Sequence, residues 1–368
     1  MPSSLIERLY RADIPSFAKF AFNELSPQHQ LGTSWHVDVM ADALQGCLER
    51  DTRRLIINAP PRSLKSHCAS IAMVVFALGQ DPTRKIMVVA GSRALANDLQ
   101  RRAVALMGTP RCRALFPNLR PTVTTGEITL PHGGGILYAT VGQSLIGRGA
   151  DIIVIDDPIT PFEAQDNSAR AGVNAWFDAE VVPRLNDKDT GVIVLVMQRV
   201  HLEDLTSHVR LRRGWTEIVL PVIALRDEAW PLHRRRTVQR LRGELLTPER
   251  EGKDRLIALL SEIDAYNFSA QYLQQPFHIS QMQRVVLAHA PRPPNWKPEM
   301  GLGGAAFVLV RASEDILFEV FGIGSRPPYA SASFPYTEEE WGASLRHQQR
   351  RLLAETQADL VRLEGQGH

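Results

Sequence analysis

Five short, uninterrupted aliphatic runs constrain the fold of this chain more than any other feature. Each run is three to five residues long, and segments with helical character separate one run from the next. Strands that are apolar at every position are buried on both faces, which is typical of a mostly parallel sheet covered by helices. The sequence therefore predicts an α/β fold whose strands include Leu55–Ile57, Ile86–Val89, Ile136–Tyr138, Ile152–Ile155 and Val192–Val196.

The segments around these runs have a different character. Residues 122–141 alternate Thr with Val, pass through the turn Pro131–Gly135 and end in a second strand, which predicts an inserted β-hairpin. Residues 1–50 are predicted to be helical, since Met40, Leu44 and Cys47 recur at helical spacing.

Beyond residue 225 the chain becomes polar and rich in arginine. A helix is predicted over Asp254–Leu260, a linker at Pro291–Trp296 and an amphipathic helix over Glu338–Leu363. The arginine clusters at 210–213 and 234–242 fit a phosphate-binding patch or a solvated face equally well.

Composition excludes several classes of protein. With 44% hydrophobic and 22% charged residues the chain has the balance of a globular protein, and its net charge of +2 is too small to prove a nucleic-acid partner. The longest apolar stretches, Ile71–Leu78 and Val192–Met197, are shorter than the ~20 residues of a membrane helix. Three scattered cysteines and a first segment without a secretion signal predict a soluble cytoplasmic protein.

The strongest local motif is a strand, a loop and a helix running from Leu55 into the stretch after Ser66. In this layout, a P-loop, backbone N–H groups and the helix dipole hold phosphates, while the Lys neutralises charge and the following hydroxyl binds Mg²⁺. The residues in these positions are Pro61, Arg62, Ser63, Leu64, Lys65 and Ser66. Because Ala59 and Leu64 replace the usual glycines, this segment alone also fits an ordinary strand-to-helix turn.

A second motif is the aliphatic strand Ile152–Ile155, which ends in Asp156 and Asp157. In P-loop ATPases the first acid belongs to the Mg²⁺ shell and the second polarises the attacking water. A strand that ends in two acids before a turn at Pro158 is also common in other α/β proteins. However, the two motifs occur in the correct order, each at the carboxyl end of a strand, where ligands of such sheets bind. Together they predict a site for ATP and Mg²⁺.

A third group of polar residues follows the strand Val192–Met197. Gln198 is placed to sense phosphate or to orient water, and Arg199 to couple hydrolysis to movement. The segment is also interpretable as a helix N-terminus, with Glu203 and Asp204 complementing the helix dipole. The two interpretations are compatible.

In this succession of motifs the chain resembles the large terminase subunit of tailed bacteriophages, the ATP-driven DNA-packaging motor. The resemblance spans roughly residues 17–276 of 368. Its collinear segments include Trp35-His36, Arg54–Ser66, Leu78–Pro82, Leu115–Pro117, Gly147–Asp151, Asp156–Pro158, Trp176-Phe177, Arg184–Asn186, Met197–His201 and Phe268–Pro276.

The resemblance implies a role for individual residues. Lys65 and Ser66 match the phosphate and Mg²⁺ residues, Asp156 the metal-shell acid, and Asp157 the catalytic carboxylate, a position that is often Glu in such motors. Arg62 matches an arginine that stabilises charge on the γ-phosphate from within the loop.

Further positions match the family in part. Gln198 and Arg199 match the coupling motif, and Trp35-His36 match the region near the adenine, although a core tryptophan fits Trp35 as well. Leu64 replaces a common family glycine. Arg148 lies between two glycines and is a candidate for an arginine that acts on a neighbouring subunit.

The resemblance also implies partners and a domain plan. We expect a P-loop NTPase domain of the RecA/ASCE-like type over residues 1–225, an arginine-rich subdomain over 226–280, and a divergent segment over 281–368. The last segment lacks the acid-tipped strands of the nuclease domain that large terminases carry. The partners implied are double-stranded DNA, a portal protein, a small terminase subunit and further copies in a ring. A prophage remnant that binds nucleotide or DNA without turnover and a helicase-type ATPase are the alternatives.

Overall fold

A computed structural model describes residues 5–32, 34–233 and 236–276. By its contacts the chain divides into two compact units: residues up to Glu251 together with Ala270–Pro276, and a second unit whose described part is Gly252–Ser269. The domain boundaries expected at residues 225 and 280 stay a prediction. The linker at 291–296, the helix at 338–363 and the segment 281–368 lie outside the described residues.

The first unit is built on an eight-stranded sheet with the order β3-β4-β5-β2-β6-β7-β1-β8. Every neighbouring pair from β5 to β8 is parallel, and only the pairs β3–β4 and β4–β5 are antiparallel. The predicted mostly parallel sheet is confirmed. Its strands are β1 (Arg54–Asn58), β2 (Lys85–Ala90), β3 (Thr122–Thr124), β4 (Glu127–Thr129), β5 (Gly135–Thr140), β6 (Ile152–Asp156), β7 (Val192–Met197) and β8 (Trp215–Val219).

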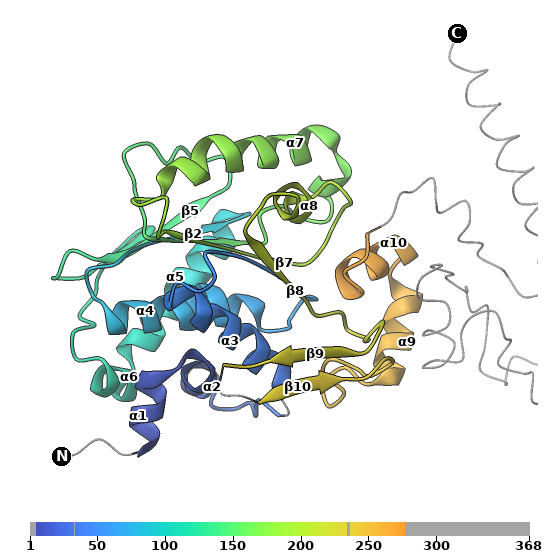
Figure 1. The fold of residues 1–368 in the computed structure, drawn as a ribbon, viewed down its shortest axis with the longest axis horizontal. Helices are drawn as coiled ribbons and strands as arrows, with labels where there is room; N and C mark the ends of the chain where they lie inside the picture. Colours follow the sequence, from blue (N-terminus) through green and yellow to red (C-terminus); the bar gives the residue numbers. More distant parts are fainter. Residues whose placement is uncertain (1–4, 33, 234–235, 277–368) are drawn as a thin grey trace, which may run out of the picture. The chain divides into compact units, whose positions relative to one another are not determined.

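Helices cover both faces of this sheet, as Figure 1 shows with α7 and α8 on one side and α3, α4 and α5 on the other. The helices of the first unit are α1 (Leu5–Ala12), α2 (Ile14–Leu25), α3 (Trp35–Leu48), η1 (His67–Met73), α4 (Val74–Gln80), α5 (Arg93–Gly108), α6 (Pro110–Leu115), η2 (Glu163–Gln165), α7 (Asn167–Trp176), η3 (Phe177–Val181), η4 (Val182–Arg184) and α8 (Leu205–Arg210). Among the described residues, none of the helices is long and apolar enough to cross a membrane.

Two hydrophobic cores follow from this layering. Successive strand residues point to opposite faces, so Leu55 and Ile57 of β1 enter the core under the N-terminal helices while Ile56 enters the other. The second core contains Trp176 and Phe177 from the α7 segment. Every residue of β6 and of β7 is buried, which explains why these two strands are aliphatic throughout.

The predicted helical start is confirmed. Asp13 caps α2, since its carboxylate accepts a hydrogen bond of 2.8 Å from the backbone N–H of Ser16. Met40, Leu44 and Cys47 are all buried along α3.

The predicted hairpin is also confirmed, with β4 and β5 joined in the register Ile128↔Ile136. Its turn is closed by the backbone N–H of Leu130, which donates to the oxygen of Gly134 at 2.8 Å. Because β5 also pairs with β2, the hairpin extends the main sheet.

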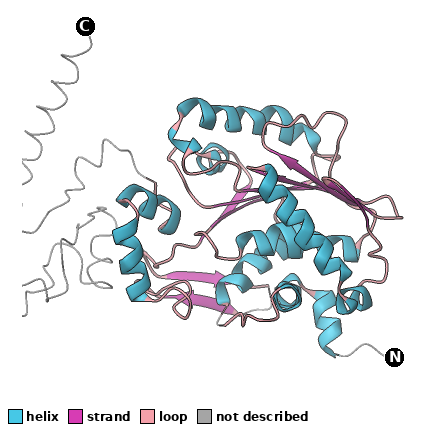
Figure 2. Ribbon diagram, turned by 180° about the vertical axis from the view of Figure 1, so that it is seen from behind, coloured by secondary structure: helices cyan, strands magenta, loops and turns pink. Residues whose placement is uncertain are grey.

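Three strands were not predicted: β8 and the antiparallel pair β9 (Glu228–Pro231) and β10 (Thr237–Arg240), drawn as a separate small magenta sheet in Figure 2. The pair lies against α3, where Trp230 of β9 stacks on Trp35 with ring centroids 5.5 Å apart. The guanidinium of Arg240 lies 5.4 Å from the centre of the Trp35 ring.

In the second unit, α9 spans Lys253–Glu262, which confirms the helix predicted over Asp254–Leu260. The short α10 (Ala265–Asn267) follows it, with the N–H of Asn267 donating to the Asp264 carboxylate at 2.9 Å. The final helical turn, η5 (Phe268–Tyr272), leads back to the first unit.

Candidate nucleotide site

The predicted P-loop connects β1 to η1 and takes up two left-handed backbone conformations. Arg62 has φ +60° and Leu64 has φ +66°, a region in which L-residues cost roughly 1–2 kcal/mol and glycine is the usual choice. Leu64 occupies the position at which the standard motif has glycine. The loop therefore has the left-handed backbone conformation typical of glycine at this position, although the residue is leucine. Between them the Ser63 hydroxyl is buried without a hydrogen-bond partner.

Lys65 brings the loop and the two acids together. Its Nζ lies 3.1 Å from the carboxylate of Asp157, and its side chain is only 6% exposed. A buried ammonium needs an opposite charge nearby, and Asp157 provides it. The two charged groups that the sequence placed at one sheet edge therefore meet.

The Asp156 carboxylate accepts hydrogen bonds from two hydroxyl groups at the start of the helix after the loop. The Ser66 hydroxyl donates to it at 2.9 Å, and the Ser70 hydroxyl donates to its other oxygen. Burial, followed by the negative charge of Asp157, raises the pKa of Asp156 to about 6, while Ser70, Lys65 and Ser66 act in the opposite direction. A raised pKa means that the ionised carboxylate is disfavoured in this environment, and a bound cation would stabilise it. The carboxylate and the neighbouring hydroxyl are both oxygen ligands of the kind that Mg²⁺ binds.

Asp157 is held in an uncommon conformation beside β2. Its φ is +42°, and its backbone N–H donates to the oxygen of Val196 at 2.9 Å. A Cβ at Gly91 would overlap the backbone oxygen of Asp157, so only glycine allows this close approach. Together these contacts fix the second acid at the ends of β2, β6 and β7.

Gln198 follows β7 directly and reaches the same acid. Its backbone N–H donates to the Asp157 carboxylate at 3.2 Å. Its side-chain amide donates to the side-chain oxygen of Gln271 at 3.4 Å. The structure therefore places Gln198 with Lys65, Ser66, Asp156 and Asp157 in one cluster.

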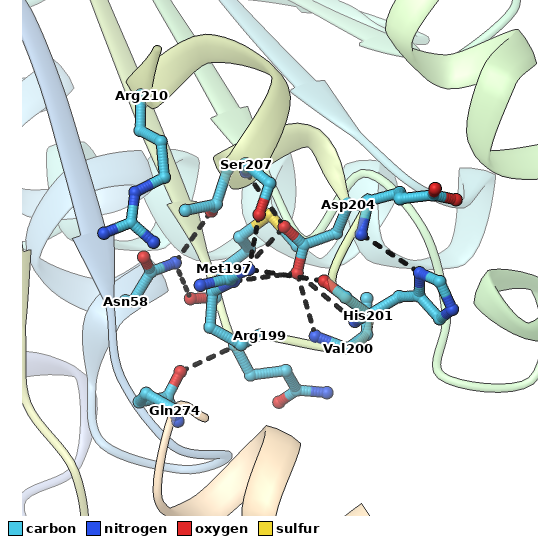
Figure 3. A network of polar contacts seen from close by, with 12 residues as sticks. Asn58, Met197, Arg199, Val200, His201, Asp204, Ser207, Arg210 and Gln274 are labelled. Carbon is cyan, nitrogen blue, oxygen red and sulfur yellow. Dashed lines mark hydrogen bonds and ion pairs between the residues drawn. The ribbon is translucent and has the colours of Figure 1, made fainter. Parts of the chain in front are cut away.

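Arg199, in contrast, is taken up by a buried ion pair (Figure 3). Its Nε lies 2.9 Å from the carboxylate of Asp204, and one Nη donates to the Ser207 hydroxyl at 2.7 Å. Asp204 is fully buried and also accepts from the backbone N–H groups of Val200 and His201. The guanidinium is thus paired within its own turn.

The helix N-terminus expected here is present at α8. Asp204 is its N-cap, accepting from the N–H of Ser207 at 3.1 Å, and Glu203 pairs with Arg170 at 2.9 Å. The interpretation as a helix start therefore accounts for Asp204, whereas Glu203 precedes the cap and pairs with Arg170 of α7.

The other residues singled out lie around this cluster or apart from it. The Arg62 side chain is exposed, and its backbone oxygen accepts a hydrogen bond from Arg250. Trp35 belongs to the stack with Trp230 described above. Arg148 forms a two-point ion pair with Glu127, at 2.9 and 3.1 Å.

His36, next to Trp35, is buried. Its pKa is lowered to about 4, first by burial and then by the charges of Arg250 and Arg240. Arg250 thus acts on His36 and also contacts the loop through the Arg62 backbone.

Two residues with structural roles at the site, Ser70 and Asn58, and one contact between predicted residues were not foreseen. Ser70 follows Ser66 by four residues, so helical spacing alone was a signal that both hydroxyls share a face. Asn58 ends β1 and donates to the oxygen of Met197 at 3.2 Å and to Thr206 at 2.9 Å. The ion pair of Arg199 with Asp204 depends on a turn whose shape the sequence does not specify.

The donor set can be compared with what ATP and Mg²⁺ require. Within the described residues, no group of three or more His, Cys, Asp or Glu side chains could hold a metal by itself. Mg²⁺ commonly takes only one or two carboxylates and completes its shell with water and phosphate oxygens. Asp156 with Ser66 fits that requirement, and the unpartnered Ser63 hydroxyl and the buried Lys65 fit an anion at the loop. The individual roles of these residues stay predictions.

The strand order defines the fold class. β7 lies between β1, which carries the loop, and β6, which carries the acids. The predicted mostly parallel α/β sheet flanked by helices is thus confirmed, and the additional strand agrees with the RecA/ASCE-like P-loop type that the sequence predicts.

No family model matches the chain, and no curated protein matches it. Solved structures with a similar fold include the large terminase of bacteriophage HK97, at 13% identity and a TM-score of 0.41, covering 72% of this chain and 56% of that one. The ATPase domain of the large terminase of Thermus phage P74-26, in a mutant form, has 13% identity and a TM-score of 0.44, covering 70% and 98%. The large terminase of another thermophilic bacteriophage, in complex with ADP, has 11% identity and a TM-score of 0.28, covering 55% and 44%. The match thus spans little more than half of the HK97 chain.

Proposed function

We propose that this chain is a Mg²⁺-dependent ATPase that moves double-stranded DNA, as the motor subunit of a phage DNA-packaging machine. The observation that supports it most is the pair of contacts at the sheet edge: Lys65 with Asp157 at 3.1 Å and Ser66 with Asp156 at 2.9 Å. They join the phosphate loop to both acids across the strand that separates them.

Each residue of the cluster has a role in this proposal. Lys65 neutralises phosphate charge, and Ser66 with Asp156 would hold Mg²⁺, which supplies charge neutralisation at the phosphates. Asp157 orients and polarises the attacking water, and Gln198 keeps the Asp157 carboxylate in place through its backbone N–H. Arg62 is exposed at the loop and is assigned to the γ-phosphate, while Trp35 is assigned to the region of the adenine.

The nucleic-acid part of the proposal rests on the resemblance in sequence to large terminases. A motor that moves along DNA contacts backbone phosphates, so its DNA stimulation should be insensitive to sequence and should fall steeply with salt. A portal protein, a small terminase subunit and further copies of this chain in a ring are the proposed partners.

Phosphate release with and without linear double-stranded DNA tests the proposal. Lys65→Ala and Asp157→Asn should each lower hydrolysis by about a hundredfold or more. Lys19→Ala is the matched control, since Lys19 forms a 2.6 Å pair with Asp38 but is 39% exposed. Omission of Mg²⁺ should abolish the activity.

Three results would contradict the proposal. Hydrolysis that survives both substitutions would show that the site lies elsewhere. Nucleotide binding with no phosphate release in the presence of DNA would favour a remnant without turnover. Unwinding of a duplex would favour a helicase-type ATPase.

A further inference from the structure

Two glutamines from a distant part of the chain contact the turn that follows β7. The Gln271 side chain accepts from the Gln198 amide at 3.4 Å, and the Gln274 side-chain oxygen accepts from the backbone N–H of Arg199 at 2.9 Å. These contacts bridge 73 and 75 residues of sequence. Figure 3 shows Gln274 reaching the Arg199 backbone from a separate segment.

The two glutamines are also joined to each other. The Gln274 amide nitrogen donates to the backbone oxygen of Gln271, so its side chain uses its oxygen on Arg199 and its nitrogen on Gln271. The segment is itself anchored, because the oxygen of Tyr272 accepts from the N–H of Val222 at 2.7 Å. The amide is therefore a fixed bridge between two backbone segments, and only 4% of the residue is exposed.

The backbone at Gln274 is strained. Its φ is +59°, in the left-handed region that is costly for a residue other than Gly, Asn or Asp. Among the described residues, the non-glycine positions with positive φ are Arg50, Arg62, Leu64, Asp157 and Gln274. All but Arg50 belong to the candidate site or contact it. Strain of this kind persists where the surroundings fix it, and it clusters at functional sites.

We propose that Gln271 and Gln274 are positioning residues, which hold the Gln198–Arg199 turn in register with Asp157. Gln274 fixes the backbone of the turn and Gln271 fixes the side chain of Gln198. The inference rests on the proposed function, because its consequence for catalysis is the orientation of the residue beside the carboxylate that polarises water.

A purely structural role is the competing explanation, and the chain contains a matched control for it. Gln100 is also buried, its oxygen accepts from the N–H of Gly126 at 3.1 Å, and its nitrogen donates to the oxygen of Thr124 at 2.6 Å. It therefore makes the same two kinds of bond as Gln274, but it ties α5 to the β3–β4 turn. The Gln100 nitrogen also donates to the oxygen of Glu127 at 3.3 Å. Methionine in either position keeps the length of the side chain and removes all of its hydrogen bonds.

The experiment compares Gln274→Met, Gln271→Met, Gln271→Glu and Gln100→Met in the full chain. Two assays are used: steady-state kinetics, which gives kcat and KM for Mg-ATP, and hydrogen exchange in the peptide 198–204. We expect Gln274→Met to lower kcat about tenfold with KM changed less than about twofold, the effect of one hydrogen bond lost from the reacting arrangement. Exchange at the Arg199 amide should rise by a similar factor.

The other variants separate positioning from stability. Gln271→Met should lower kcat about fivefold, and Gln271→Glu, which keeps the acceptor for Gln198, should restore it. Gln100→Met should lower the melting temperature as much as Gln274→Met and leave kcat and the exchange of peptide 198–204 unchanged.

Equal losses of kcat in Gln100→Met and Gln274→Met would overturn the inference, as would unchanged exchange in Gln274→Met. If Gln274→Met does not fold, the pair Gln271→Met and Gln271→Glu carries the test. A wild-type chain without hydrolysis would refute the proposed function, while the exchange of peptide 198–204 would still decide whether Gln274 holds the turn.

Discussion

His67 makes the stability of the nucleotide site depend on pH. It is the first residue after Ser66 and is 2% exposed. Its Nε2 lies 2.9 Å from the backbone oxygen of Ala18, so Nε2 carries the proton and donates, while Nδ1 is buried without a partner. Burial is the main cause that lowers its pKa from 6.5 to about 4, and the nearby charge of Arg102 adds to it. The hydrogen bond to Ala18 acts in the opposite direction.

The sign of the effect follows from linkage. The unfolded chain takes up a proton at His67 near pH 6.5 and the folded chain only near pH 4, so the stability present above pH 6.5 is lost as the pH falls towards 4. Between pH 7 and pH 5 the loss from this residue is about 2 kcal/mol, at 1.36 kcal/mol for each pKa unit.

The assay is urea unfolding of the wild-type chain and of His67→Gln at both pH values, without Mg²⁺. Glutamine can still donate to Ala18 and does not titrate, so the variant should lose about 2 kcal/mol less than the wild type on acidification. The comparison between the two chains is needed because Asp156 has the opposite effect. Its pKa is raised to about 6 in the fold, so its protonation stabilises the folded chain as the pH falls over the same range.

Replacement of the exposed His132 by glutamine is the control, and its pH dependence should follow the wild type. An identical response of His67→Gln and wild type would refute the reasoning, because it would mean that His67 is protonated as easily in the fold as in the unfolded chain.

Three further predictions concern the same sheet edge. Asp204→Ala should lower the free energy of unfolding by about 3–5 kcal/mol, because it leaves the buried guanidinium of Arg199 unpaired. Asp98→Ala, which breaks the exposed ion pair of Asp98 with Arg101, should cost less than about 1 kcal/mol. Urea unfolding measures both. Gly91→Ala should displace the second acid and lower both ATP hydrolysis and melting temperature, whereas Gly108→Ala, where a Cβ meets nothing within 4 Å, should lower neither. Leu64→Gly should retain nucleotide affinity, and Leu64→Val should lose it, because a β-branched residue tolerates positive φ poorly. A titration with a fluorescent nucleotide measures both affinities. Equal affinities would contradict the backbone strain proposed for the loop.

The layered fold was predictable because its central strands are buried on both faces. Such strands are aliphatic at every position, so β6 and β7 are visible in the sequence without knowledge of their neighbours. β8 was not, since Trp215–Val219 mixes polar and apolar residues at the sheet edge. The pair β9–β10 lies in an arginine-rich stretch whose partner, Trp35, is almost two hundred residues away in the sequence.

The candidate site was predictable in its residue types and less so in its contacts. Lys65, Ser66, Asp156 and Asp157 were identified because each follows a recognisable strand. The pairing of Arg199 with Asp204 and the bridge from Gln274 depend on the shapes of two turns, which local sequence preference does not determine.

The position of β7 has a practical consequence. It is hydrogen-bonded on both sides to parallel neighbours, and all six of its residues are buried. β7 cannot shift along its axis without breaking the hydrogen bonds to both neighbouring strands. A conformational change caused by nucleotide binding or hydrolysis would therefore occur in the turn after β7. The signal of a spectroscopic label on that turn should change when nucleotide binds, whereas the signal of a label within the strand should not.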